Sequence, residues 1–278
     1  MSEPRTAAGR LLDVLAAFDQ DNQALTLTAI GHRAGLRLTT AHRLVGELTR
    51  WGALERDGAG RYTIGLRLWE TAALAPRGVV LRQAAMPFLE DLYEATHENV
   101  QLAVRDGLDV VYIERISGRS AVGVRSQVGA RWPLHATGVG LALLAHGDAA
   151  LQEQVLGAPL AAFTPHTVTD PARLRRMLAE TRRTGYSLSD RQITDDALSV
   201  AAAVRGGDGA VVAAVSLVVH AERAQPQRLA PAVLVAARGI SRALGWQPGG
   251  RPGGQPDGQS EGQSEGQSEA GPQGEPAG

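Results

Sequence analysis

The chain has 278 residues, 44% of them hydrophobic, and its 28 basic and 29 acidic side chains give a formal net charge of −1. This length and composition allow two domains with hydrophobic cores, and the charge balance excludes a protein that is basic throughout. The absence of cysteine excludes disulfides, a catalytic thiol and thiolate metal ligands.

The beginning of the chain carries no targeting signal. Residues 1–10 lack the apolar core of a signal peptide, and no later run approaches the roughly 20 apolar residues that span a bilayer. We therefore expect a cytoplasmic protein that does not contact a membrane.

The second and third of the first three predicted helices form a helix-turn-helix. Residues 6–18 form the first helix, and Thr26 can cap a second, short one. Gly35 can end that helix in the left-handed conformation, and a third helix follows from about Leu38. Its apolar residues recur at helical spacing and predict one buried stripe, made of Ala41, Leu44, Val45 and Leu48.

The opposite side of this third helix is polar and suited to DNA. It carries Thr39, Thr40, His42 and Arg43, and Arg37 stands just before it. Arg43 is the best candidate for a bidentate guanine contact, and the two threonines are better placed for phosphates or thymine methyl groups. The alternative is a helical hairpin whose polar face is merely solvated.

Two short β-rich runs follow and predict a hairpin. Residues 51–56 and 61–64 flank an Asp57-Gly58 turn, and a hairpin in this position is the wing of a winged helix. Arg56 and Arg61 flank its tip and can contact backbone phosphates. Residues 31–67 hold seven arginines against three acidic side chains, which favours DNA over the alternative of a surface turn with incidental arginines.

This order of elements resembles the IclR family of bacterial transcriptional regulators. The motifs in register are YTIG at 62–65, LRLWETA at 66–72, VVYIER at 110–115, PLHATG at 133–138 and GYS at 185–187. The resemblance covers residues 6–244 and implies a winged helix-turn-helix, a linker helix that helps to pair two subunits, and a GAF-like effector domain. The chain departs from the family pattern at Ala29, Leu141 and Ser199, where an acidic residue, a lysine and a cysteine are usual.

Composition and breaker residues then set the expected domain boundaries. They are 1–65 for the DNA-binding domain, 66–80 for the linker helix, 81–246 for the effector-binding domain and 247–278 for a disordered tail in which GQSE occurs three times. Pro76 is expected to close the linker helix. The apolar side of that helix, with Leu66 and Trp69, could instead pack within its own subunit.

Strands, then helices, then strands again predict an α+β effector domain with a mostly antiparallel sheet. The expected helices span 81–97, 141–145, 151–156, 171–183 and 226–244. The expected strands span 100–104, 110–116, 121–128, 185–189, 198–204 and 210–219.

The start of the 141–145 helix is the candidate ligand site. Thr137 can cap it, and the free amides at a helix start can bind a carboxylate, although glycines here could also serve packing alone. The resemblance implies a pocket lined by Gly138, Val139, Ser189, Asp190, Ser199 and Ser216. Hydroxyls inside apolar strands need partners, which an organic or aromatic acid could supply, and so could the main chain.

Nothing in the sequence predicts catalysis, a metal or a cofactor. The histidines form no i, i+4 pair, no P-loop or nucleophile elbow is present, and Asp190, Asp195 and Asp196 are expected in a solvated loop. We predict a ligand-responsive regulator that binds a pseudo-palindromic double-stranded DNA site as a homodimer or a dimer of dimers. Repression is favoured over activation. The alternative is a sensor module that acts through protein partners, with the winged helix as a protein contact.

Overall fold

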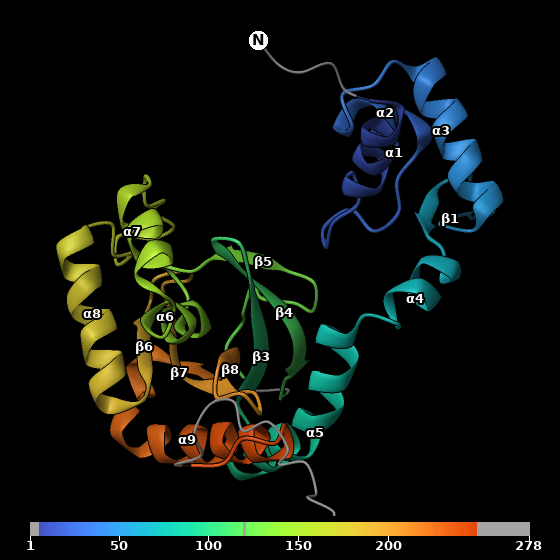
Figure 1. Cartoon of the computed structure of the whole chain (residues 1–278). Helices are drawn as coiled ribbons and strands as arrows, with labels where there is room; N and C mark the ends of the chain where they lie inside the picture. The colour runs from blue at the N-terminus through green and yellow to red at the C-terminus, as the bar shows by residue number, and fades with distance from the viewer. Residues whose placement is uncertain (1–5, 119–120, 249–278) are drawn as a thin grey trace, which may run out of the picture.

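The computed structural model describes residues 6–118 and 121–248, and they form two parts joined by a short helix (Figure 1). The predicted disordered tail therefore lies almost entirely outside the described residues. The N-terminal part consists of α1 (Ala7–Ala16), α2 (Leu27–Arg33), α3 (Leu38–Trp51), β1 (Leu54–Arg56) and β2 (Tyr62–Ile64). The joining helix is α4 (Leu66–Ala72).

The predicted helix signals are present in the N-terminal part. The Thr26 hydroxyl accepts a hydrogen bond of 3.2 Å from the amide of Ala29, and Gly35 has a φ of 64°, so α2 begins and ends as expected. The predicted stripe of α3 is buried, and it packs with Val14 and Ile30 in one small core. This packing fixes the direction of the polar side of α3.

The wing is an antiparallel pair in which Leu54 lies opposite Ile64 and Arg56 lies opposite Tyr62. Tyr62 also bridges to Leu25, which ties the wing to the start of the helix-turn-helix. A Cβ atom at Gly65 would collide with the carbonyl oxygen of Gly52, so this close approach requires glycine.

The C-terminal part is a six-stranded antiparallel sheet in the order β5-β4-β3-β8-β7-β6. Its strands are β3 (Asn99–Asp106), β4 (Asp109–Ile116), β5 (Arg131–Pro133), β6 (Ser187–Asp190), β7 (Ala197–Arg205) and β8 (Val211–His220). The predicted α+β class with a mostly antiparallel sheet is confirmed. The central neighbours β3 and β8 come from distant parts of the chain, so residues far apart in sequence meet at the middle of the sheet.

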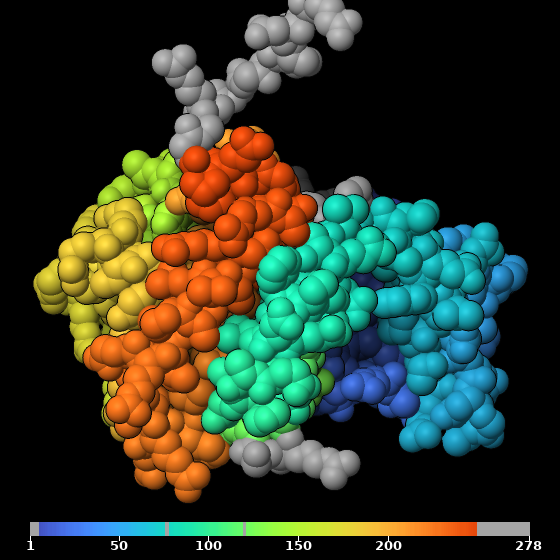
Figure 2. Space-filling model, turned by 90° about the horizontal axis from the view of Figure 1, so that it is seen from below, coloured from blue at the N-terminus to red at the C-terminus, as the bar shows by residue number. Residues whose placement is uncertain are grey.

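Helices cover both faces of this sheet (Figure 1). Those on one face are α5 (Pro76–Thr96) and α9 (Pro226–Ala243), which lie side by side in Figure 2, with a 3-10 turn (Ala221–Arg223) before α9. Those on the other face are α6 (Gly138–Ala145), α7 (Ala149–Gly157) and α8 (Pro171–Thr184). Each layer encloses its own core, and every residue of α6 is buried, so α6 is the central helix of its layer.

Two expectations about the elements are wrong. Pro76 does not close the linker helix but is the first residue of α5, where its missing amide hydrogen costs nothing and its φ is already helical. Residues 121–128 form no strand, because the backbone of Tyr112 on β4 pairs with Gly129 and Ala130 instead. Residues 121–130 are therefore irregular. Within the described residues, no helix combines the length and apolar character needed to cross a bilayer.

Candidate functional site

The polar side of α3 points away from the small core. Thr39, His42 and Arg43 are exposed, Thr40 is half-buried, and Arg37 is the exposed N-cap residue that makes no side-chain capping bond. A helix held by one buried stripe presents its opposite side as a rigid row. Such a row can enter a major groove.

Arg43 already has a partner within its helix. Its Nη1 donates to Oε1 of Glu47 at 2.6 Å, one turn later, and its side chain is 60% exposed. Exposed pairs of this spacing are worth about 0.3–0.5 kcal/mol, so a base or phosphate could replace Glu47 at little cost.

The wing holds its two arginines on a fixed turn. Asp57 accepts hydrogen bonds from the backbone and side chain of Arg61 and from the amide of Ala59, and these bonds lower the pKa of Asp57. The guanidinium of Arg56 lies 5.6 Å from the ring centre of Tyr62. Both arginines are exposed, so the wing and α3 both present cations to solvent.

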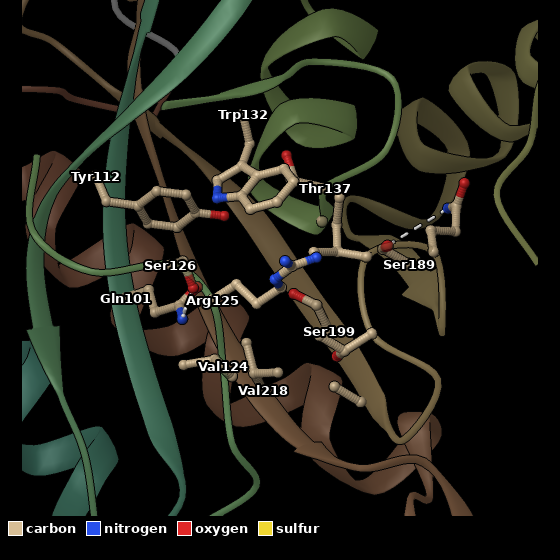
Figure 3. A pocket seen from close by; sticks show the side chains of 15 residues that line it. Gln101, Tyr112, Val124, Arg125, Ser126, Trp132, Thr137, Ser189, Ser199 and Val218 are labelled. Atoms are coloured by element: carbon tan, nitrogen blue, oxygen red, sulfur yellow. Dashed lines mark hydrogen bonds between the residues drawn. The ribbon is translucent and has the colours of Figure 1, made fainter. Parts of the chain in front are cut away.

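A cavity of about 50 Å³ lies between the sheet, the start of α6 and the segment that follows β4 (Figure 3). It is lined by Gln101, Tyr112, Val124, Arg125, Ser126, Trp132, Thr137, Gly138, Ser189, Gln192, Ile193, Thr194, Ala197, Ser199 and Val218. These residues include members of all six strands. Below, the cavity is called the ligand pocket.

The structure brings three of the six expected residues to the pocket, Gly138, Ser189 and Ser199. The other three do not line it. Val139 is buried in the core of the α6 layer, because the turn of the helix directs it away from the sheet opening. Asp190 is exposed and paired with Arg191, since alternate residues of β6 face opposite sides. Ser216 lies deeper, with its hydroxyl donating to Oε1 of Gln101 at 3.4 Å.

Among the described residues that line the pocket, Arg125 alone is charged. Its guanidinium lies 5.7 Å from the ring centre of Trp132, and Figure 3 shows it crossing the pocket between Trp132 and Ser199. Sequence reasoning missed Arg125, because it placed this residue in a strand of the sheet. A lone cation among neutral hydrogen-bonding groups favours a monoanionic ligand.

A chain of polar side chains lines one side of the pocket. Nε2 of Gln101 donates to Oγ of Ser126 at 2.6 Å, and the buried side chain of Tyr112 also lines the pocket. Burial raises the pKa of Tyr112, so this hydroxyl remains a neutral donor. Gln101 could have been noticed in the sequence as a polar residue between the apolar Val100 and Leu102.

The glycines at the start of α6 serve close packing. Thr137 Oγ1 accepts from the amide of Gly140 at 3.0 Å, as predicted for a cap. A Cβ atom at Gly138 would collide with Ser199 Oγ, and one at Gly140 would collide with the carbonyl oxygen of Leu134. The packing explanation therefore holds for both glycines, and Gly138 lines the pocket as well.

The two pocket serines differ in their partners. The Ser189 hydroxyl donates to the carbonyl oxygen of Ala136 at 2.9 Å, which is the main-chain alternative considered above. Ser199 makes no side-chain hydrogen bond within the described part of the chain, so its hydroxyl can serve a ligand. Among those same residues, no group of three or more His, Asp or Glu is arranged to hold a metal ion.

Comparisons with known proteins match both parts of the chain to bacterial transcriptional regulators. Residues 75–242 match the model of the bacterial transcriptional regulator IclR C-terminal domain, and residues 7–58 match the IclR helix-turn-helix domain. The chain is 32% identical over 242 residues to the transcriptional regulator XynR of Escherichia coli, covering 85% of this chain and 96% of XynR. It is 31% identical over 247 residues to the transcriptional repressor AllR of Klebsiella pneumoniae, covering 87% and 91%.

A solved structure gives the same result for the fold. An IclR homologue from Microbacterium hydrocarbonoxydans, crystallised with 4-hydroxybenzoate, matches with a TM-score of 0.82 and 38% identity. The match covers 86% of this chain and 99% of the homologue.

Proposed function

Because the chain belongs to the IclR family of bacterial transcriptional regulators, we propose that it represses genes by binding a pseudo-palindromic DNA site and leaves that site when a small organic acid occupies the ligand pocket. We assign DNA binding to residues 1–65, connection to 66–80 and effector binding to 81–246. The protein would act in the cytoplasm, where its DNA is.

The DNA contacts are assigned to α3 and the wing. Arg43, His42 and the threonines of α3 would meet base edges and phosphates, and Arg37, Arg56 and Arg61 would grip the backbone. The support is the exposure of these side chains on a helix whose opposite stripe is buried. A homodimer or a dimer of dimers would place two such helices in successive major grooves.

The acidic nature of the effector rests on one observation, the position of Arg125 as the single charged group among the described residues that line the ligand pocket. A carboxylate can accept two hydrogen bonds from a guanidinium, and Trp132 offers a flat apolar face to a ring. The homologue that binds 4-hydroxybenzoate supports an aromatic acid. The pocket has a volume of about 50 Å³, so side chains that line it must move to admit such a ring.

The test begins with selection of bound fragments from random double-stranded DNA. Each selected complex is then titrated with small carboxylic acids, including 4-hydroxybenzoate, and with the neutral amide of each acid. We expect at least one acid to release the DNA while its amide does not, since only the carboxylate carries the negative charge that forms an ion pair with Arg125. Failure to select any DNA, or equal action of acid and amide, contradicts the proposal.

A further inference from the structure

Residues 125–132 lie between the ligand pocket and a second, larger cleft. Arg125 and Trp132 line the ligand pocket, and both also line a cleft of about 850 Å³ between the two parts of the chain. Residues 18–21, Gln23 and two residues of β2, Thr63 and Ile64, line the N-terminal side of this cleft. One stretch of backbone, residues 125–132, therefore contacts both the pocket and the approach to the winged helix. Below it is called the connecting segment.

The connecting segment is attached to the pocket by several bonds. Ser126 Oγ accepts the 2.6 Å hydrogen bond from Gln101, which also lines the pocket. The backbone of Tyr112 exchanges hydrogen bonds of 2.7 and 3.1 Å with Gly129 and Ala130. A side chain that moves inside the pocket therefore acts on this segment directly.

The same segment is attached to the N-terminal part by a direct bond. Nε2 of Gln20 donates to the carbonyl oxygen of Val128 at 2.8 Å, across 108 positions of sequence. Gln20 follows Asp19, which accepts bonds from Asn22 and from Arg33, the last residue of α2. The loop that holds Gln20 is therefore anchored to the helix-turn-helix itself.

Charge on the two sides of the cleft is opposite. Asp19 and Asp21 line the side of the winged helix, and Arg125 and Arg131 line the side of the connecting segment. An anion that enters the ligand pocket pairs with Arg125, whose guanidinium already lies across that pocket, and neutralises its charge. Neutralisation of one cation weakens the attraction between the two sides of the cleft.

We propose that residues 125–132 transmit occupancy of the ligand pocket to the winged helix of the same chain. When the pocket is empty, Ser126 and Arg125 hold the segment in the position where Val128 accepts from Gln20. An anionic occupant moves both residues, breaks the Gln20 bond and releases the N-terminal part from the effector domain. The identity of the occupant rests on the proposed function, but the connection between Ser126 and Gln20 does not.

The test uses the absence of cysteine in the chain. Asp21→Cys and Gln127→Cys, both exposed and on opposite sides of the proposed contact, carry spin labels in the full-length protein, diluted with unlabelled chain so that only intrachain pairs contribute. Pulsed electron resonance then gives the distance distribution between the labels. We expect one short, narrow distribution without ligand.

Two further substitutions probe the two ends of the connection. Gln20→Ala removes the bond to Val128, and Ser126→Ala removes the bond to Gln101. Each should raise the ratio of separated to closed molecules by roughly two- to tenfold, as expected for loss of one hydrogen bond. Gln83→Ala on α5 and Ser117→Ala after β4 are the matched controls and should leave the distribution unchanged.

The outcomes separate the ideas. If Gln20→Ala separates the labels and Ser126→Ala does not, the pocket end is not connected and the proposal is wrong. If neither changes the distribution, the Gln20 contact does not hold the two parts together, and the proposal fails again. The measurement needs neither DNA nor effector, so a failure to find operator or ligand would count against the proposed function alone.

Discussion

Arg43 is exposed on α3 and paired with Glu47, so it is oriented without being buried. Arg43→Ala should reduce affinity for the selected operator by about 1–3 kcal/mol, the cost expected for loss of the bidentate guanine contact that we propose. Competition with operators that differ at single base pairs should show the loss concentrated at one position. Arg50→Ala, on the last turn of the same helix, is the control. An equal loss on every sequence would make Arg43 a phosphate contact.

Arg125 is the residue on which the acidic effector depends. Arg125→Met keeps a long side chain against Trp132 but removes the charge, so binding of the acid should weaken by about 1.5–3 kcal/mol. Calorimetry with the acid and its amide measures this, and Arg131→Met, which lies outside the ligand pocket, is the control. If both ligands lose equal affinity, Arg125 acts through packing and not through its charge.

Two histidines, the buried His135 and the half-buried His146, should make stability depend on pH. Burial lowers the pKa of His135 and His146 below the usual 6.5, so the folded protein keeps them neutral at a pH where the unfolded chain protonates them. Their contribution to the free energy of unfolding is full above pH 6.5 and falls as pH drops below it.

The variants His135→Gln and His146→Asn test this dependence. Each replacement can keep the hydrogen bond, to the carbonyl oxygen of Ala161 or of Ala142, without titrating. Urea unfolding on either side of pH 6.5 should give a smaller difference for the double variant than for the parent. An unchanged difference would assign the pH dependence to other groups.

At the scale of elements, the sequence predicted those helices and turns whose structure depends only on residues close together in the chain. Thr26, Gly35 and the stripe on α3 act within a few residues, and all three are confirmed. Residues 121–128 show the limit. Their composition favours a strand, but the backbone of Tyr112 pairs elsewhere, and only the folded sheet determines that choice.

The cap of α2 offers a test at the same scale. Thr26→Ala should destabilise the N-terminal part by about 0.5–2 kcal/mol, because the amide of Ala29 loses its acceptor. Hydrogen exchange of the amides of α2 in the full chain measures the local loss, and Thr26→Ser should restore most of it. A protection pattern unchanged by alanine would mean that packing of Ile30 alone defines this helix end.

At the scale of the whole molecule, the ligand pocket forms only where all six strands and the segment before β5 meet. The sequence could predict Gly138, Ser189 and Ser199 through family resemblance, since they lie near recognisable motifs. It could not predict Arg125, whose segment has no regular structure. The sequence also predicted wrongly that Ser216 lines the pocket. The register of β8 against β3 places Ser216 opposite Gln101, to which its hydroxyl donates, and away from the pocket.

Several large apolar side chains in the joining region are exposed in the single chain. The exposed fractions are 63% for Leu66, 68% for Trp69 and 80% for Leu74, on and just after α4. Large apolar side chains exposed together mark association sites, and the proposed homodimer would bury them against a second copy. Trp69→Glu should therefore shift the protein to monomers in sedimentation, and Val235→Glu, an equal change on α9, should not.

Loss of the dimer should lower affinity for a full operator by an amount that follows from the linkage of its two half-sites. Two joined winged helices bind the second half-site as an intramolecular event, which raises affinity by about 10²–10⁴ over one alone. Trp69→Glu should lose that factor on a full operator and almost nothing on an isolated half-site. If the variant stays dimeric, the apolar side of α4 does not hold the dimer together. If it becomes monomeric yet keeps full operator affinity, the operator is not read by two linked helices.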